Sequence, residues 1–312
     1  MNLLKIGALA LLICSILSCD EPSKVDIVGW GDSLMKGSGG DKSVLEVLAK
    51  ELNISHKNFA VGGLNSSSIG VLQGGIPMKV VLENNLILED EPTKLSYYNI
   101  EPLNFLTKPS RKGFLESIEG KLERISEKEN DKKTIGYTFS AKGIDKPIKT
   151  KDTLIFTFED ALDYRNKWTI IWAGRNDAKS VNQIFKTRDN IQAMINHLGE
   201  NAQEHLLILS VCNGIADNEY RGSKPYAEIN RLNALLKESF GNRFVDIRGY
   251  MVKDAIFDME IAPTQQDLED MKKDCIPRSL LKDNVHFNTL GYEAAGKYLA
   301  QLIKKKGWLN QK

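Results

Sequence analysis

Short apolar runs rich in β-branched residues alternate with helical patterns in two separate parts of this chain. In the first part, an apolar run at 25–30 precedes a helical pattern at 44–52. The remaining expected strands are 59–61, 168–173, 206–212 and 243–247, and the remaining expected helices are 181–198, 226–240 and 290–304. Strands separated by helices of this length form a parallel sheet with helices on both faces. The sequence therefore predicts an α/β fold.

The segment between these two parts, residues 76–163, has a different pattern. It alternates with period 2 at 79–82, 134–139 and 153–158, and charged, turn-rich pieces separate these runs. Structureless loops of this length are rare in compact domains. We therefore expect a small antiparallel β-rich domain, inserted between the α/β parts at 25–75 and 164–312. A single large domain with a long excursion is the alternative.

The N-terminal sequence has the pattern of an export signal. One cation, Lys5, precedes an apolar run at 6–17, which is too short for a membrane span of about 20 residues. The run ends in Ile-Leu-Ser-Cys at Cys19, which resembles the lipobox of bacterial lipoproteins. The resemblance implies a signal peptide at 1–18, lipidation of Cys19, a tether at 19–24 and membrane anchoring in the cell envelope, periplasmic or surface-exposed. An ordinary signal peptide is the alternative, and it also predicts export.

Charge and cysteine content exclude some classes of function. The 312 residues include 42 Lys and Arg against 41 Asp and Glu, a net charge of +1, which argues against a nucleic-acid partner. The 42% hydrophobic content is sufficient for a buried core. Beyond the N-terminus only Cys212 and Cys275 are present, without the spacing of a zinc site. They could form a disulfide or be two buried thiols.

Two distant motifs supply a nucleophile and a base. Gly-Asp-Ser-Leu places Ser33 directly after the first expected strand, at the sheet edge where open α/β folds bind ligands. A serine hydroxyl is a weak nucleophile and requires a base. Asp-Asn-Val-His, before the last expected helix, provides His286 as that base and Asp283 to orient the imidazole.

Two further motifs supply hydrogen-bond donors for a developing oxyanion, which acyl transfer requires. Gly62 and Gly63 follow the expected strand at 59–61 with unobstructed backbone N–H groups, and Asn176 follows the strand at 168–173 with a side-chain amide. All of these motifs are expected at the carboxyl edge of one sheet. Their convergence points to acyl-transfer chemistry.

The four motifs, in this order, resemble those of the SGNH, or GDSL-type, serine hydrolases. The resemblance implies a three-layer, flavodoxin-like α/β fold and the catalytic residues Ser33, Asp283 and His286. It also implies an oxyanion hole formed by the Ser33 N–H, the Gly63 N–H and the Asn176 amide. The insert between the second and third motifs is longer than in many members. The other histidines, at 56, 197 and 205, lack such partners and are expected to be structural.

The expected activity is two-step ester hydrolysis without a metal or organic cofactor. The family includes lipases, thioesterases and carbohydrate esterases, so the fold does not select the substrate. Export, the β-rich insert and the polar loop containing Asn213 and Glu219 favour O-acetyl groups on a carbohydrate or cell-envelope glycan. The alternatives are a lipase or phospholipid esterase, an acetyltransferase, and a non-catalytic glycan-binding surface lipoprotein.

Overall fold

A computed structural model describes residues 26–104, 109–129, 132–178, 181–215 and 218–311. The predicted signal peptide, Cys19 and the tether lie outside these residues. No helix in the described ranges is long and apolar enough to cross a membrane.

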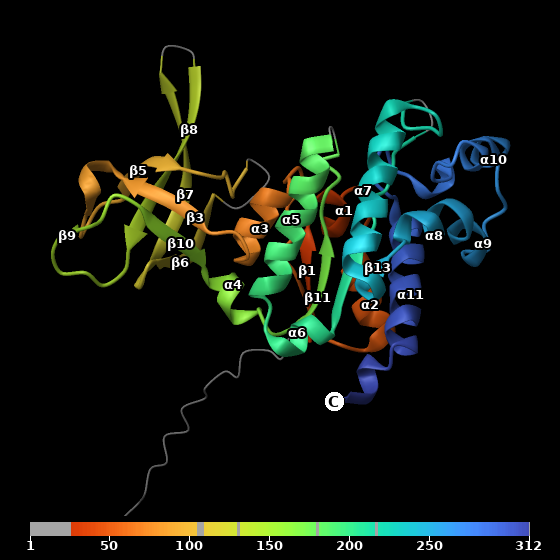
Figure 1. Ribbon diagram of the computed structural model, residues 1–312, viewed down its shortest axis with the longest axis horizontal. Helices are drawn as coiled ribbons and strands as arrows, with labels where there is room; N and C mark the ends of the chain where they lie inside the picture. Colours follow the sequence, from red (N-terminus) through yellow and green to blue (C-terminus); the bar gives the residue numbers. More distant parts are fainter. Residues whose placement is uncertain (1–25, 105–108, 130–131, 179–180, 216–217, 312) are drawn as a thin grey trace, which may run out of the picture.

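One part of the molecule is a parallel five-stranded sheet with helices on both faces (Figure 1). The strand order is β13-β12-β11-β1-β2, and every neighbouring pair is parallel. The strands are β1 (Ile27–Gly31), β2 (His56–Asn58), β11 (Trp168–Trp172), β12 (Leu206–Leu209) and β13 (Phe244–Val245). This arrangement confirms the predicted α/β fold.

Alternate strand residues belong to two hydrophobic cores, one on each face of the sheet. Val28 and Trp30 pack into the core that includes α3, α5 and α7, whereas Ile27 packs into the core that includes α2, α8 and α11. The longer helices are α2 (Val44–Leu52), α3 (Ser66–Gln73), α5 (Val181–His197), α7 (Lys224–Phe240), α8 (Ile247–Lys253), α10 (Gln265–Lys272) and α11 (Thr289–Lys305). The shorter ones are α1 (Ser33–Lys36), α4 (Glu159–Asp163), α6 (Glu200–Glu204) and α9 (Ala255–Asp258). Burial on both faces explains why β1, β11 and β12 have almost continuous apolar sequences.

The strand expected at 59–61 is wrong, because β2 occupies His56–Asn58 instead. The chain does continue alongside β1 after β2: the Phe59 and Val61 N–H groups donate to the Gly29 and Gly31 carbonyls at 2.9 and 3.0 Å. The N–H of Ala60, which lies between these two residues, donates to the side chain of Asn58, at 3.1 Å from its Oδ1. Burial of Phe59 and Val61, rather than a regular strand, accounts for the apolar run.

A closed six-stranded β-barrel lies between α3 and β11 in the chain. Around the barrel, the strand order is β10-β3-β5-β8-β7-β6, and all neighbouring strands are antiparallel. The strands are β3 (Met78–Leu82), β5 (Thr93–Tyr98), β6 (Ser110–Leu115), β7 (Ile118–Glu129), β8 (Lys132–Ala141) and β10 (Leu154–Phe158). A separate small pair is formed by β4 (Leu86–Ile87) and β9 (Ile148–Lys149). We call the six-stranded unit the barrel.

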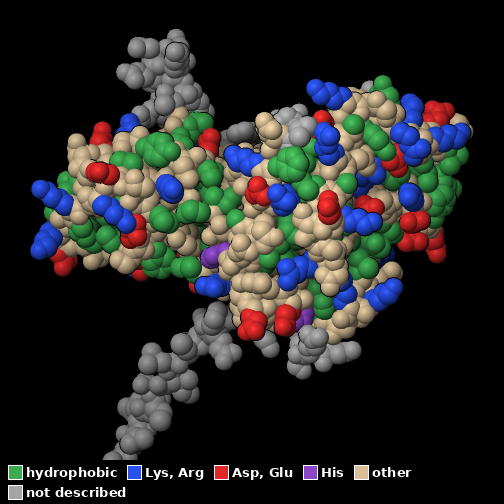
Figure 2. Space-filling model, viewed as in Figure 1, with side chains coloured by type: hydrophobic (Ala, Val, Ile, Leu, Met, Phe, Trp, Pro, Cys, Tyr) green, Lys and Arg blue, Asp and Glu red, His purple; other side chains and the backbone are tan. Residues whose placement is uncertain are grey.

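The barrel packs directly against the α/β part, and its interior is continuous with the core of one sheet face. Aromatic side chains, among them Tyr137, Phe139 and Phe156, fill the barrel and are almost fully buried. At the junction, Nζ of Lys57 on β2 lies 3.4 Å from Oδ1 of Asp160 on α4. On the face shown in Figure 2, acidic and basic side chains are interspersed over both parts, consistent with the near-zero net charge.

The two cysteines of the described chain are free and buried. Burial raises the pKa of the Cys212 thiol to about 12 and that of Cys275 to about 11. Of the two arrangements left open by the sequence, the structure therefore has the buried thiols. Both thiols are held protonated at neutral pH, which makes them poor nucleophiles.

Candidate active site

Ser33 lies where β1 ends and α1 begins, at the carboxyl edge of the sheet. The preceding Gly31 is required for a close approach: a Cβ on it would lie 2.5 Å from the carbonyl oxygen of Trp172 and 2.6 Å from Cβ of Met35. Asp32 caps α1. Ser33 is the first residue of α1 and is partly exposed. This tight turn places Ser33 at the carboxyl edge of the sheet, where it lines a cavity.

The Asp32 carboxyl is 1% exposed beneath this turn. Its Oδ1 accepts the Leu34 N–H at 3.0 Å, whereas Oδ2 has no hydrogen-bond partner in the described structure. Burial raises the pKa of Asp32 to about 7, although the Leu34 N–H and the charge of Arg175 act in the opposite direction. Asp32 therefore changes its charge near neutral pH.

This shift predicts a pH-dependent stability. The folded pKa of Asp32, about 7, exceeds the ordinary value of 3.8, so its stabilising contribution is complete below pH 3.8 and is lost as pH rises through 7. Asp32→Asn keeps a capping oxygen and stays neutral. Its free energy of unfolding relative to wild type should rise by about 2 kcal/mol between about pH 5 and pH 8, measured by urea denaturation. A difference that does not vary with pH would contradict the assignment.

His286 and Asp283 form a compact turn before α11. Oδ1 of Asp283 accepts the backbone N–H groups of Val285 and His286, both at 2.8 Å, and Oδ2 lies 2.8 Å from Nδ1 of His286. Partial burial raises the pKa of Asp283, but these hydrogen bonds outweigh it, and the pKa lies below its ordinary value. The carboxylate therefore stays ionised and orients the ring, which leaves Nε2 available as a base.

The loop after β2 carries Gly63, whose φ of +78° is in the left-handed region that favours glycine. Asn176, in the loop after β11, donates from Nδ2 to the Leu64 carbonyl at 2.9 Å. An amide nitrogen has two hydrogens, so one remains for a ligand. The two predicted oxyanion donors therefore come from loops that are hydrogen-bonded to each other.

A buried network fastens the same two loops more firmly. The Asp177 carboxylate accepts both the N–H and the hydroxyl of Ser66, each at 2.8 Å. Nδ2 of Asn190 on α5 donates to Oγ of Ser66 at 2.8 Å and to Oγ of Ser67 at 3.0 Å. These groups are nearly inaccessible to solvent, which strengthens the bonds and fixes the loop geometry.

One cavity of about 710 Å³ collects the predicted residues. Its lining includes Ser33, Gly63, Asn176 and His286, and Asp283 supports it through His286. The structure therefore brings together all the predicted site residues that lie within the described ranges. Among those ranges, no cluster of three or more His, Cys, Asp or Glu side chains is arranged to hold a metal ion.

Charged residues outside the predicted catalytic set also line the cavity, among them Glu219 of the expected recognition loop. Nη2 of Arg175 lies 2.9 Å from Oε1 of Glu219, and both side chains are mostly buried. Lys224 and Glu228 contribute from α7. Arg175 adjoins the predicted Asn176, which could have marked it, whereas Glu228 carries no recognisable local signal. Asn213, expected in a recognition loop, is instead fully buried and donates to the Glu219 carbonyl at 3.0 Å.

A family model described as GDSL-like lipase/acylhydrolase matches residues 27–299, which include every one of these site residues. The chain belongs to this family. As a GDSL-family member it is related to enzymes that hydrolyse esters, and the parallel sheet fits that membership. The barrel, from β3 to β10, lies within the matched range.

Solved structures similar to this GDSL-family chain include a G-D-S-L family protein from Desulfitobacterium hafniense DCB-2. The two are 12% identical with a TM-score of 0.42, and the similarity covers 88% of this chain and 97% of the other. A second structure is a peptidoglycan O-acetylesterase, 13% identical with a TM-score of 0.38, covering 90% and 91% of the two chains. No curated protein matches the sequence significantly.

Proposed function

We propose that the protein is a serine esterase that removes O-acetyl groups from a carbohydrate or cell-envelope glycan through an acyl-enzyme. The observation that carries the esterase assignment is the convergence of Ser33 and the Asp283-oriented His286 on one cavity. Membership of the GDSL-like lipase/acylhydrolase family supports the same reaction class.

In the first step, Nε2 of His286 accepts the proton of the Ser33 hydroxyl as Oγ forms a bond to the ester carbonyl carbon. The carbonyl π electrons move to its oxygen, and the N–H groups of Ser33 and Gly63 and the Asn176 amide stabilise the resulting charge. Collapse of this intermediate breaks the bond to the sugar oxygen. That oxygen takes the proton from His286 and leaves as an alcohol, and acetyl-Ser33 remains.

In the second step, a water molecule enters in place of the departed alcohol. Nε2 of His286 removes one proton from it as the water oxygen bonds to the acetyl carbon. The intermediate then releases Oγ of Ser33, which recovers the proton from His286, and acetic acid leaves. Asp283 remains ionised throughout and holds Nδ1–H of His286.

Polar features around the site support a sugar substrate. Arg175, Glu219 and Glu228 place charged groups on the cavity wall, where they can bind hydroxyls, and Pro225 and Val285 offer apolar surface for the C–H face of a sugar ring. A second cavity of about 380 Å³ adjoins the first at Gly63, and residues of both the α/β part and the barrel segment before β6 line it. We propose that neighbouring sugars of the glycan extend into this second cavity.

The substrate assignment predicts a preference for short acyl groups and for polymers. Among p-nitrophenyl esters, acetate should have a kcat/KM at least about 10-fold above that of palmitate, because the charged side chains of Arg175, Glu219 and Glu228 on the cavity wall disfavour burial of a long acyl chain. Acetate release should be faster from acetylated oligosaccharides than from an acetylated monosaccharide. Both rates are measured with Ser33→Ala as control.

Each alternative has its own outcome in these assays. Faster hydrolysis of palmitate than of acetate would identify a lipase. Glycan binding with equal acetate release by wild type and Ser33→Ala would identify a non-catalytic binding protein. Transfer of the acetyl group to an added sugar, with little free acetate, would identify an acetyltransferase.

We also propose that the mature protein is a lipoprotein anchored to the cell envelope through Cys19. The support is the apolar run at 6–17 and the Ile-Leu-Ser-Cys sequence that follows it. Expressed in a bacterial host, wild type should partition into the detergent phase of a Triton X-114 extract, and Cys19→Ala should partition into the aqueous phase. Equal partitioning of the two proteins would contradict lipidation.

A further inference from the structure

The barrel side of the molecule contributes a hydrogen bond to the loop that carries Gly63. Nδ2 of Asn104, in the segment between β5 and β6, donates to the Gly62 carbonyl oxygen at 2.8 Å. The Gly62 carbonyl and the Gly63 N–H belong to one planar trans peptide group, in which they point in opposite directions. Asn104 therefore holds, from its carbonyl end, the peptide group that supplies the proposed oxyanion donor.

The surrounding cavities show the same two-sided arrangement. Gly62 and Gly63 line the cavity of Ser33 and His286, whereas Gly63 and Asn104 line the adjoining cavity. The glycine loop thus separates the two spaces. Asn104 reaches the peptide group from the space opposite the proposed reaction centre.

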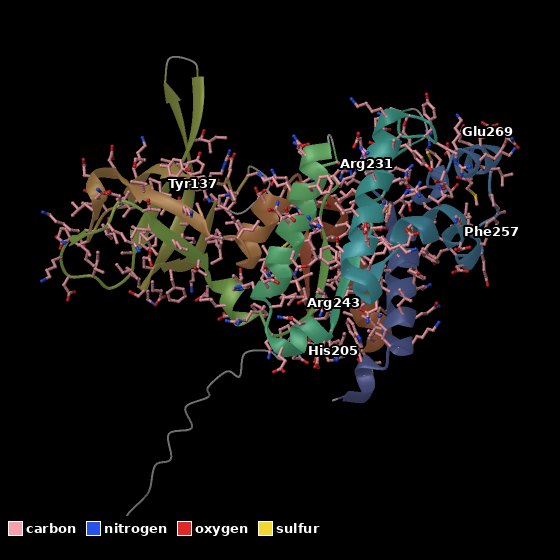
Figure 3. The ribbon with its side chains drawn as sticks, viewed as in Figure 1. Tyr137, His205, Arg231, Arg243, Phe257 and Glu269 are labelled. Carbon is pink, nitrogen blue, oxygen red and sulfur yellow. The ribbon has the colours of Figure 1, made fainter. Side chains whose placement is uncertain are left out.

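The barrel fixes the backbone next to Asn104. The Tyr137 hydroxyl donates to the Leu103 carbonyl at 2.7 Å and accepts the Leu103 N–H at 3.3 Å. Tyr137 lies on β8 of the barrel (Figure 3), and both Tyr137 and Leu103 are fully buried. A buried side chain that bonds both polar groups of Leu103 leaves the adjacent residue little freedom.

We propose that Asn104 is a positioning residue for the oxyanion hole, so that the barrel completes the reaction centre of the α/β part. This inference rests on the proposed esterase function. The Asn104 bond fixes the plane of the Gly62–Gly63 peptide group and aims the Gly63 N–H toward the developing oxyanion. It also polarises the peptide group, which makes that N–H a stronger donor.

The test compares two variants at the same junction. Asn104→Asp keeps the size of the side chain and removes the donor to Gly62. Tyr98→Phe is the matched control, because the hydroxyl of Tyr98, on β5 just before the same segment, donates to the Ile135 carbonyl at 3.3 Å and not to the glycine loop. With p-nitrophenyl acetate, Asn104→Asp should lower kcat about 10- to 100-fold with KM within about twofold. Tyr98→Phe should keep kcat within about twofold of wild type.

A second readout does not depend on activity. In protein labelled with ¹⁵N-glycine, the Gly63 amide resonance, assigned from its absence in Gly63→Ala, should shift in Asn104→Asp and stay in place in Tyr98→Phe. Equal kcat values for wild type and Asn104→Asp, or an unshifted Gly63 resonance, would overturn the role of Asn104. An inactive wild type would instead overturn the esterase proposal, and the Gly63 resonance would still decide the role of Asn104.

Discussion

Ser33→Ala is expected to lower kcat for p-nitrophenyl acetate by at least about 10⁴-fold. The substitution removes the only atom that forms a bond to the acyl group, whereas the Gly63 and Asn176 donors still line the cavity. The remaining rate should equal that of uncatalysed hydrolysis assisted weakly by those donors. Steady-state kinetics with purified wild type and variant measure the effect.

The loss should occur without a loss of stability. In the described structure the Ser33 hydroxyl makes no hydrogen bond, and alanine is the better helix former at the start of α1. We therefore expect the free energy of unfolding to change by less than about 0.5 kcal/mol. If Ser33→Ala unfolds more easily than wild type, loss of folded protein would have to be excluded as the cause of its lower kcat. If Ser33→Ala is fully active, Ser33 is not the nucleophile.

His286→Ala is expected to lower kcat by at least about 10³-fold, because no other described histidine lines the cavity. The residues of a catalytic triad act as a unit, so Ser33→Ala combined with His286→Ala should be no slower than Ser33→Ala alone. The three rates are measured on p-nitrophenyl acetate at one pH. If the loss of kcat in the double variant equals the product of the two single losses, Ser33 and His286 do not act as a unit.

Asp283→Asn provides the graded comparison for His286→Ala. It replaces the acceptor of the His286 ring N–H by an amide while keeping the shape of the turn. Because the Asp283 side chain is 53% exposed, solvent can take over part of its role. We expect a loss of about 10- to 10³-fold, smaller than for His286→Ala. A larger loss of kcat in Asp283→Asn than in His286→Ala would indicate that His286 is not the base.

The α/β elements could be predicted because their signals are local. The helix expected at 44–52 is found as α2, where Ser43 and Glu46 form a capping box and the apolar face repeats within nine residues. The strand at 168–173 is found as β11 at Trp168–Trp172, since burial on both faces makes it continuously apolar. Neither inference needs knowledge of distant partners.

Much of the barrel could not be predicted for the opposite reason. β7 has one solvated face and alternates Glu119, Lys121 and Glu123 along it, so its sequence looks like a charged loop. It is a strand because it pairs with β6 and β8. The backbone also approaches closely at Gly120, where a Cβ would lie 2.4 Å from the Ser140 carbonyl oxygen. The domain boundaries at 76 and 163, which are inferred from the sequence pattern alone, stay predictions.

The residues of the site also differ in whether the sequence alone could identify them. Ser33, Gly63, Asn176, Asp283 and His286 lie in short motifs whose order is visible in the sequence. Asn104 is 42 positions from Gly62 and belongs to no motif, and only the barrel's packing brings the two together. Residues that act through another group carry no chemical signature of their own, so the structure is needed to find them.

The proposed mechanism requires that Ser33 becomes covalently acylated. Its most direct test is intact-protein mass spectrometry after incubation with a fluorophosphonate, which reacts with activated serines. We expect one adduct per wild-type chain, mapped to the peptide containing Ser33, and no adduct on Ser33→Ala. An adduct of equal yield on Ser33→Ala, or on another residue of wild type, would contradict the role of Ser33 as the nucleophile.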